Sequence, residues 1–108
     1  MNSSLPLPVD RAIRKLGSDI SLARRRRRIS QASLAERMGA SVSTVRRMEK
    51  GDPRVPIHFF ARALHVFGEI AALEQLLDTP NDEIGLTLMD EQLPWRVRSK
   101  RHDPSGAL

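Results

Sequence analysis

The 108-residue sequence contains no cysteine and no tyrosine, and only one tryptophan and three phenylalanines. Without cysteine the chain can form no disulfide bond and has no thiolate nucleophile, which is compatible with the reducing cytoplasm we expect for it. Because aromatic residues make up only 4% of the chain, aliphatic side chains must build most of the core. No run of about 18 apolar residues and no secretory signal pattern is present, so we expect no membrane association.

The sequence also lacks the usual features of an active site. It has no glycine-rich phosphate loop and no pair of carboxylates beside a histidine. The three histidines, His58, His65 and His102, are too scattered to form a metal site. We therefore expect no enzymatic activity, no cofactor and no bound metal ion.

Positive charge is missing from one segment of the chain. Residues 63–95 contain seven acidic residues and no lysine or arginine, whereas residues 1–62 contain 14 lysines and arginines and five acidic residues. Residues 96–108 are basic again. Such clusters can simply be solvated faces, but a basic half suits a polyanion, and the acidic segment would then face a dimer partner or another protein.

Prolines, glycines and serines divide the chain into expected helices. Pro6 and Pro8 predict a flexible arm over residues 1–8, and Asp10 can cap or charge the start of the first helix. An all-α, five-helix domain is expected over residues 9–78, followed by a C-terminal extension with a basic tail over residues 79–108. The predicted helices span about 10–27, 31–38, 41–50, 57–67 and 69–77.

Apolar residues at helical spacing predict the buried faces of three helices. They are Ile13, Leu16, Ile20 and Ala23 in the first; Ile57, Phe60, Ala61, Leu64 and Phe67 in the fourth, with Phe59 beside them; and Ile70, Leu73, Leu76 and Leu77 in the fifth. The segment 83–93 is ambiguous. Its apolar residues fit a short helix, which we favour, or a strand that pairs across a dimer axis.

Residues 30–51 predict two short helices joined by a tight turn at Gly39. Ser30 and Ser41 are the expected caps, and helices this short need a supporting core. The second helix has an outward polar face that suits a negatively charged groove, and it consists of Ser43, Arg46, Arg47 and Lys50. This pattern is typical of a helix-turn-helix motif that reads DNA.

Five consecutive arginines, residues 24–28, precede this motif. They extend over more than one helical turn, so their side chains point in different directions and some must face the core or a neighbouring helix. A buried arginine needs a carboxylate partner. The exposed arginines can reach phosphates.

A set of motifs between residues 16 and 67 matches a known pattern. The motifs are Leu16-Gly17, Ala23-Arg24, Arg27, Gln31, Leu34-Ala35, Gly39, Ser41, Thr44-Val45, Glu49-Lys50-Gly51 and Ala63-Leu64. They resemble the XRE family of phage-repressor-like helix-turn-helix proteins, which have a lambda-repressor-like fold. The resemblance implies a structural ion pair between Arg24 and Glu49 and a phosphate contact from Gln31. It also implies base contacts from Ser41, Val42, Ser43, Arg46 and Arg47.

Other residues beside the second helix of the motif are candidates for phosphate contacts. They are Thr44, Arg28, Lys50 and Arg54. Arg46 and Arg47 point about 100° apart, so we expect only one of them to read a base, and the family geometry favours Arg47. Val42 can belong to the core, but the family phasing favours an outward position. A homodimer on a palindromic double-stranded operator is expected.

The C-terminal region has a narrower resemblance. Residues 82–86, 93–94 and 96–98 resemble the tail of HipB-type antitoxins, which repress their own operon and bind a HipA-like serine/threonine kinase toxin. Trp95 would then anchor in the partner, although it can also pack against its own domain. The alternative is a stand-alone XRE-family transcriptional regulator without a toxin partner.

Overall fold

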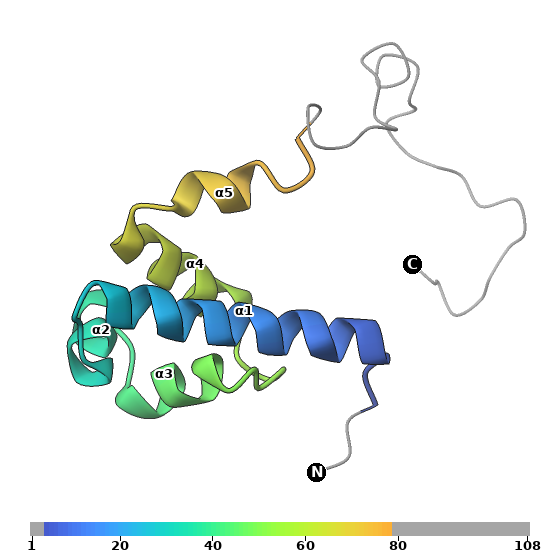
Figure 1. The fold of residues 1–108 in the computed structure, drawn as a ribbon, viewed down its shortest axis with the longest axis horizontal. Coiled ribbons are helices and arrows are strands. Elements are labelled where there is room, and N and C mark those ends of the chain that lie inside the picture. Colours follow the sequence, from blue (N-terminus) through green and yellow to red (C-terminus); the bar gives the residue numbers. More distant parts are fainter. Residues whose placement is uncertain (1–3, 79–108) are drawn as a thin grey trace, which may run out of the picture. The chain divides into compact units, whose positions relative to one another are not determined.

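The structure is a computed structural model that describes residues 4–78. Every regular element in this range is a helix, which confirms the predicted all-α fold class. The helices are α1 (Leu7–Arg26), α2 (Gln31–Met38), α3 (Val42–Glu49), α4 (Ile57–Phe67) and α5 (Ile70–Glu74) (Figure 1). The chain divides into two units, Met1–Gln75 and Leu76–Leu108, and these five helices belong to the first. None of the five is long and apolar enough to cross a membrane.

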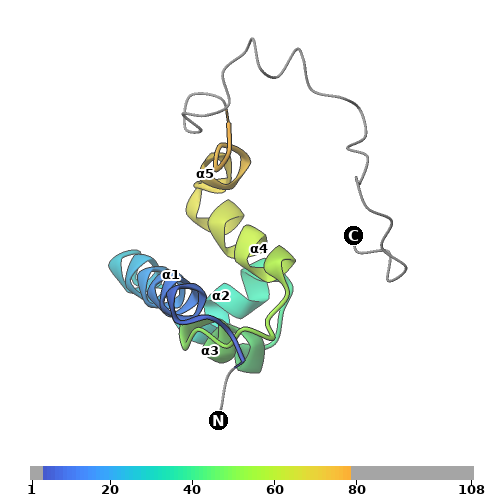
Figure 2. The ribbon, with the colours of Figure 1, turned by 90° about the vertical axis from the view of Figure 1, so that its right-hand side faces the viewer.

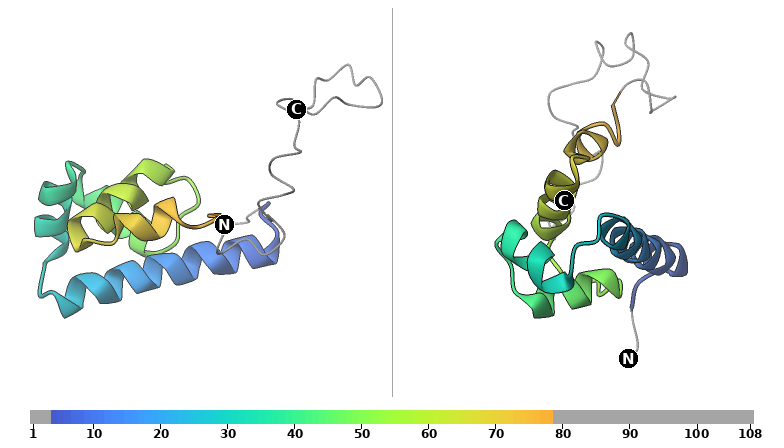
Figure 3. Two further views of the ribbon diagram at one scale, coloured as in Figure 1. Left: turned by 90° about the horizontal axis from the view of Figure 1, so that it is seen from above. Right: turned by 60° about the vertical axis from the view of Figure 1, so that its left-hand side comes forward.

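Within the first unit, α2, α3 and α4 lie on one side of α1 (Figure 2, Figure 3). The helix α1 packs against α3 and α4, α2 packs against the same two helices, and α5 packs against α4. The core is aliphatic apart from Phe60 and Phe67, as the composition predicted. At its centre, Leu34 of α2 and Val45 and Met48 of α3 have no exposed surface. Burying each of them contributes about 1.5–3 kcal/mol, and this burial stabilises two helices that are too short to be stable alone.

The predicted caps of α2 and α3 are confirmed, and α2 spans the predicted residues, whereas α3 is one residue shorter at each end than the predicted range 41–50. The Ser30 hydroxyl accepts a hydrogen bond from the Ser33 N–H at 3.0 Å, and the Ser41 hydroxyl accepts one from the Thr44 N–H at 3.1 Å. Gly39 ends α2 with a φ of 70°, in the left-handed region that favours glycine. Each serine cap stabilises its helix by about 1 kcal/mol, so local sequence chemistry fixes where the turn lies.

The first helix begins earlier than the sequence predicted. Pro6 is its N-cap, and Pro8 lies in its first turn. A proline is tolerated there because the first N–H groups of a helix have no partner within the helix. The expected arm over residues 1–8 is therefore wrong for Leu7 and Pro8, and Asp10 contributes charge to the first turn rather than a cap.

In α1 and α4, one residue each that was expected in the core is exposed. Leu16 is 40% exposed, because α1 turns the neighbouring Gly17 toward α3. Ile57, at the first position of α4, is 69% exposed, and this helix buries Phe60, Ala63 and Phe67 instead. Helical spacing gave the correct period in both helices, but it did not fix the direction of the buried face.

The fifth helix is shorter than predicted. It ends at Glu74, although the apolar spacing predicted a helix to residue 77. None of its residues is buried, and Leu76 and Leu77 beyond it are 65% and 83% exposed. The expectation that these two leucines belong to the core of the domain was therefore wrong.

Close contact between α1 and α3 depends on Gly17. A Cβ atom at this position would lie 2.9 Å from the Glu49 carbonyl oxygen and closer still to the Met48 carbonyl oxygen. Both contacts are with backbone atoms, so no side-chain rotation can relieve them. Gly17 thus sets the distance between α1 and the end of α3.

We expect Gly17→Ala to lower the free energy of unfolding by about 2 kcal/mol or more, because the added methyl group must push α3 away from α1. Alanine is otherwise the better helix former by up to about 1 kcal/mol, so a loss of stability reports the steric contact. Urea denaturation followed by circular dichroism measures the change. Ser18→Ala, at an exposed position of the same helix, is the control and should change stability by less than about 0.5 kcal/mol.

Candidate nucleic-acid interface

A buried ion pair fixes the end of α3. Arg24 of α1 donates from Nε to Glu49 Oε2 at 2.7 Å and from Nη2 to Glu49 Oε1 at 3.1 Å. Its Nη1 donates to the Ile29 carbonyl oxygen at 2.9 Å. The two side chains are only 11% and 7% exposed. The structure therefore contains the ion pair that the family resemblance implied, in a bidentate geometry that fixes both position and direction.

Gln31, the first residue of α2, joins the same cluster. Its Nε2 donates to Glu49 Oε1 at 3.0 Å, so one carboxylate connects α1, α2 and α3. An amide nitrogen carries two hydrogens, and the second remains available for a phosphate at the start of α2. The N-terminus of a helix also attracts anions through its free N–H groups.

The outward face of α3 is polar and exposed. Ser43, Arg46, Arg47 and Lys50 are all exposed, whereas Val45 and Met48 on the other face are fully buried. The side chain of Arg46 has no hydrogen bond or ion pair within residues 4–78, and that of Arg47 makes only a long 3.5 Å hydrogen bond from Nη2 to Thr44 Oγ1. Both guanidinium groups can therefore turn toward a ligand without breaking a strong interaction.

Three residues assigned to the interface are engaged in the fold. Thr44 is only 7% exposed, and its hydroxyl forms a 3.0 Å hydrogen bond with that of Ser41, so its expected phosphate contact stays a prediction. Val42 is partly buried against the core rather than fully outward. Ser41 is exposed as a residue, but its hydroxyl already caps α3.

Arg27 and Arg28 occupy the turn between α1 and α2. Arg28 is exposed and has a φ of 56°, and it is the one residue other than glycine with a positive φ in the described part of the chain. The Ile29 N–H donates to the Arg24 carbonyl oxygen and the Arg28 N–H to that of Arg25, which is the hydrogen-bond pattern of a Schellman C-cap. Arg27 lies over the Phe67 ring, 4.8 Å from its centroid. Arg28 is thus available for a phosphate, whereas Arg27 holds α4.

Arg54, after α3, is bound to Asp52. Its Nε and Nη2 donate to the two carboxylate oxygens at 3.1 and 3.0 Å, and its backbone N–H donates to Oδ1 at 2.9 Å. These hydrogen bonds lower the pKa of Asp52 to about 2, so its carboxylate remains ionised at neutral pH. The Arg54 side chain is 79% exposed, whereas that of Asp52 is only 13% exposed.

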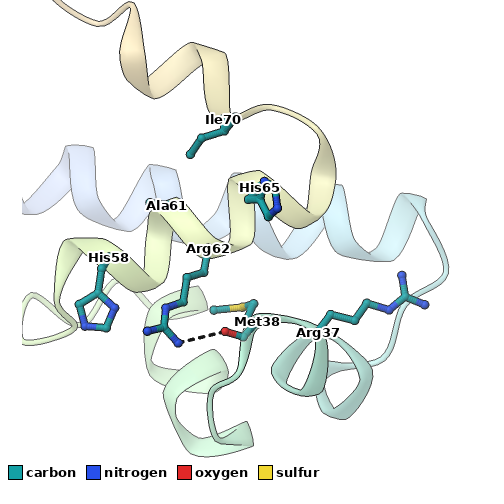
Figure 4. A pocket seen from close by; sticks show the side chains of 7 residues that line it. All are labelled: Arg37, Met38, His58, Ala61, Arg62, His65 and Ile70. Carbon is teal, nitrogen blue, oxygen red and sulfur yellow. Dashed lines mark hydrogen bonds between the residues drawn. The ribbon is translucent and has the colours of Figure 1, made fainter.

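Arg62 of α4 holds the turn of the motif, a role that the sequence did not reveal. Its Nη1 donates to the Met38 carbonyl oxygen at 3.1 Å (Figure 4). It also donates to the Gly39 carbonyl oxygen at 3.1 Å. Its guanidinium carbon lies 5.3 Å from the centroid of the Phe59 ring. Carbonyl groups at a helix C-terminus carry partial negative charge, so an arginine is favourable there. No local pattern identifies this contact, because it joins residues 23 or more positions apart.

Lys50 and Trp95 are the remaining residues assigned to an interface. Lys50 is exposed at the C-cap of α3. Trp95 and the ambiguous segment 83–93 lie outside the described residues, so their assignments stay predictions.

We expect Glu49→Ala to lower the free energy of unfolding by about 3–5 kcal/mol, because it leaves Arg24 buried without a counter-charge. The double variant Arg24→Met/Glu49→Leu should recover most of this loss, since it removes both buried charges. Chemical denaturation of each variant tests this. Glu36→Ala, at an exposed position of α2, is the control. A double variant as unstable as the single variant would show that the loss arises from packing and not from an unpaired charge.

The comparisons with known proteins agree with this geometry. Residues 15–83, more than half of the chain, match a family model described as a helix-turn-helix domain. A search of curated proteins and a search of solved structures each found no match. Helix-turn-helix domains bind DNA by placing their second helix in the major groove, and here that helix is α3. The chain therefore belongs to the helix-turn-helix domain family.

Proposed function

We propose that the protein is a sequence-specific transcriptional repressor that reads DNA with α3. The exposure of Arg46, Arg47 and Lys50 on a helix whose other face is fully buried carries this proposal. Because its other face is buried, the backbone of α3 loses little conformational freedom on binding. Its basic side chains can therefore contact DNA from a helix that is already fixed in place.

Charge supports the same proposal. Residues 1–62 carry nine more basic than acidic residues, and this half contains the helix-turn-helix motif. Each phosphate that a lysine or arginine neutralises releases counterions from DNA, so binding should weaken steeply as salt increases. This contribution attracts the protein to any DNA and does not distinguish sequences.

Specificity then depends on contacts with base edges. An arginine can donate two hydrogen bonds to guanine O6 and N7, which discriminates by about 1–3 kcal/mol. Arg47 is the residue we assign to this contact, with Ser43 and Arg46 beside it. Gln31, Arg28, Lys50 and Arg54 would fix the position of α3 through phosphates.

We propose a homodimer on a two-fold related operator. One small domain covers too few bases for high specificity, whereas two copies read two half-sites about 34–36 Å apart. None of the residues of α5 is buried in the chain, and the partly exposed Ile70 and Leu73 offer an apolar surface for a second copy. The acidic residues of this region would keep the dimer surface away from DNA.

The base-reading role of Arg47 is testable on DNA selected by the protein from a randomised duplex library. We expect Arg47→Gln to reduce discrimination between the selected sequence and a scrambled one by about tenfold or more, and Arg46→Gln to reduce it less. Fluorescence anisotropy titrations measure both affinities.

Arg37→Gln is the matched control for this experiment. Arg37 is an exposed arginine of α2 that lines a cavity with α4 and α5 and not the outward face of α3 (Figure 4). The Arg37→Gln variant loses the same charge as Arg47→Gln does, and it should keep the DNA sequence preference of the wild-type protein. Failure of the wild-type protein to enrich any sequence would contradict a sequence-specific repressor, and loss of preference only in Arg46→Gln would transfer the base contact to that residue.

The finer proposal is that this repressor is a HipB-type antitoxin with a HipA-like serine/threonine kinase as its partner. Its support is the sequence resemblance of residues 82–86, 93–94 and 96–98. Trp95 is the residue we assign to the partner contact, because tryptophan is enriched where interfaces bury most of their energy. A stand-alone regulator of the same family is the alternative.

Purification of the tagged full-length protein from its native cells separates these two functions. We expect a kinase to copurify in a ratio near one to one, and Trp95→Ala to reduce its recovery without changing DNA affinity, because the tail and not α3 would bind it. Mass spectrometry identifies the copurified protein. Recovery of the protein alone, with DNA binding intact, would favour the stand-alone regulator.

A further inference from the structure

A groove beside the recognition helix α3 contains more positive charge than the sequence analysis assigned to this place. It has a volume of about 420 Å³ and lies between the start of α1, the end of α3 and the turn that follows α3. Four basic side chains line it, and they are Arg14, Arg47, Lys50 and Arg54. Two acidic side chains, Asp10 and Asp52, also line it. Arg14 was not among the predicted interface residues.

Gly51 brings Arg14 to this place. Gly51 has a φ of 78°, and a Cβ atom on it would lie 2.7 Å from the Arg14 Cα and 2.9 Å from its Cγ. The turn after α3 therefore packs directly on the backbone of α1, and the connection to α4 lies beside the N-terminal half of α1 (Figure 1). A side chain on residue 51 would separate Arg14 from Lys50 and Arg54.

In both ion pairs of the groove the arginine side chain is more exposed to solvent than the aspartate that it binds. Asp10 and Asp52 are 20% and 13% exposed, whereas Arg14 and Arg54 are 66% and 79% exposed. Arg14 uses only its Nε on Asp10, at 2.9 Å, and Arg54 uses its Nε and Nη2 on Asp52. Both Nη groups of Arg14 and the Nη1 of Arg54 therefore remain as donors on the solvent side.

We propose that this groove binds a backbone phosphate of DNA through Arg14, Lys50 and Arg54, beside the bases that α3 contacts. The proposal rests on the proposed DNA-binding function and adds α1 to the interface. The two carboxylates beneath the arginines hold the guanidinium groups outward. Their negative charge also weakens the attraction for any anion, which lowers affinity for DNA in general.

The first test compares two basic residues of α1. Arg14→Gln removes a charge from the groove, whereas Lys15→Gln removes an equally paired charge that does not line it, since Lys15 binds Asp19 at 2.7 Å. The probe is a fluorescein-labelled duplex of mixed sequence, titrated with the full chain at several salt concentrations. We expect Arg14→Gln to weaken binding at about 0.1 M salt more than Lys15→Gln does, by up to about eightfold, and to reduce the salt slope by up to about 0.9 per protomer, which is the effect of losing one whole phosphate contact.

The second test compares two variants, one that removes a negative charge from the groove and one that removes a negative charge outside it. Asp52→Asn keeps an oxygen that can accept from Arg54, so the turn is retained and only the charge changes. We expect it to strengthen binding to the same duplex more than Asp19→Asn does. Thermal denaturation by circular dichroism confirms that each variant is folded.

The outcomes separate this inference from the proposed function. If the wild-type protein binds DNA and Arg47→Gln weakens binding, but Arg14→Gln behaves as Lys15→Gln does, then the groove site is overturned and DNA binding stands. Equal gains in duplex affinity from Asp52→Asn and Asp19→Asn would also overturn the groove site, because the gains would then report only the change in overall charge. A wild-type protein that binds no duplex would overturn the proposed function itself.

Discussion

The arrangement of the motif depends on one carboxylate. Glu49 is the last residue of α3, where the partial negative charge of the helix end makes an acidic side chain unfavourable. Its position is stabilised because Arg24 and Gln31 both donate to it, and each comes from a different helix. The carboxylate therefore joins the end of α1, the start of α2 and the end of α3. A rotation of α3 that broke the hydrogen bonds between Arg24 and Glu49 would leave two buried charges unpaired.

Two glycines allow α1 to lie close to the end of α3 and to the turn that follows it. Gly17 lets α1 approach the final carbonyl groups of α3, and Gly51 lets the following turn pack on Arg14. The end of the recognition helix is thus held against α1, and the candidate phosphate contacts gather near this end. Gln31 donates to Glu49, the last residue of α3, and the groove of Arg14, Lys50 and Arg54 lies beside the turn that follows. The major groove of DNA is about 12 Å wide and has a phosphate backbone on each side, so phosphate contacts beside α3 would fix its position there.

Sequence patterns predicted the features that are set locally. Ser30, Gly39 and Ser41 fixed the ends of α2 and α3, because caps act within one turn of the chain. The partner of Arg24 came from family resemblance, since no local rule joins residues 25 positions apart. The burial of Thr44 was missed because a threonine beside a cap can face either side. The Arg62 contact with the turn and the place of Arg14 beside Lys50 both arise from packing between distant segments, which periodicity does not report.

The arginine run shows why composition alone cannot define an interface. Arg24 is buried on Glu49, Arg27 covers the ring of Phe67, and Arg28 occupies a left-handed turn. Of these three side chains, only that of Arg28 makes no hydrogen bond or ion pair within residues 4–78, although all three contribute equally to the net charge. Conversely, Arg14 and Arg54 have acidic partners, yet their free donors face solvent. The positive charge that DNA could contact therefore depends on which guanidinium groups still have free donors, and not on the number of arginines in a segment.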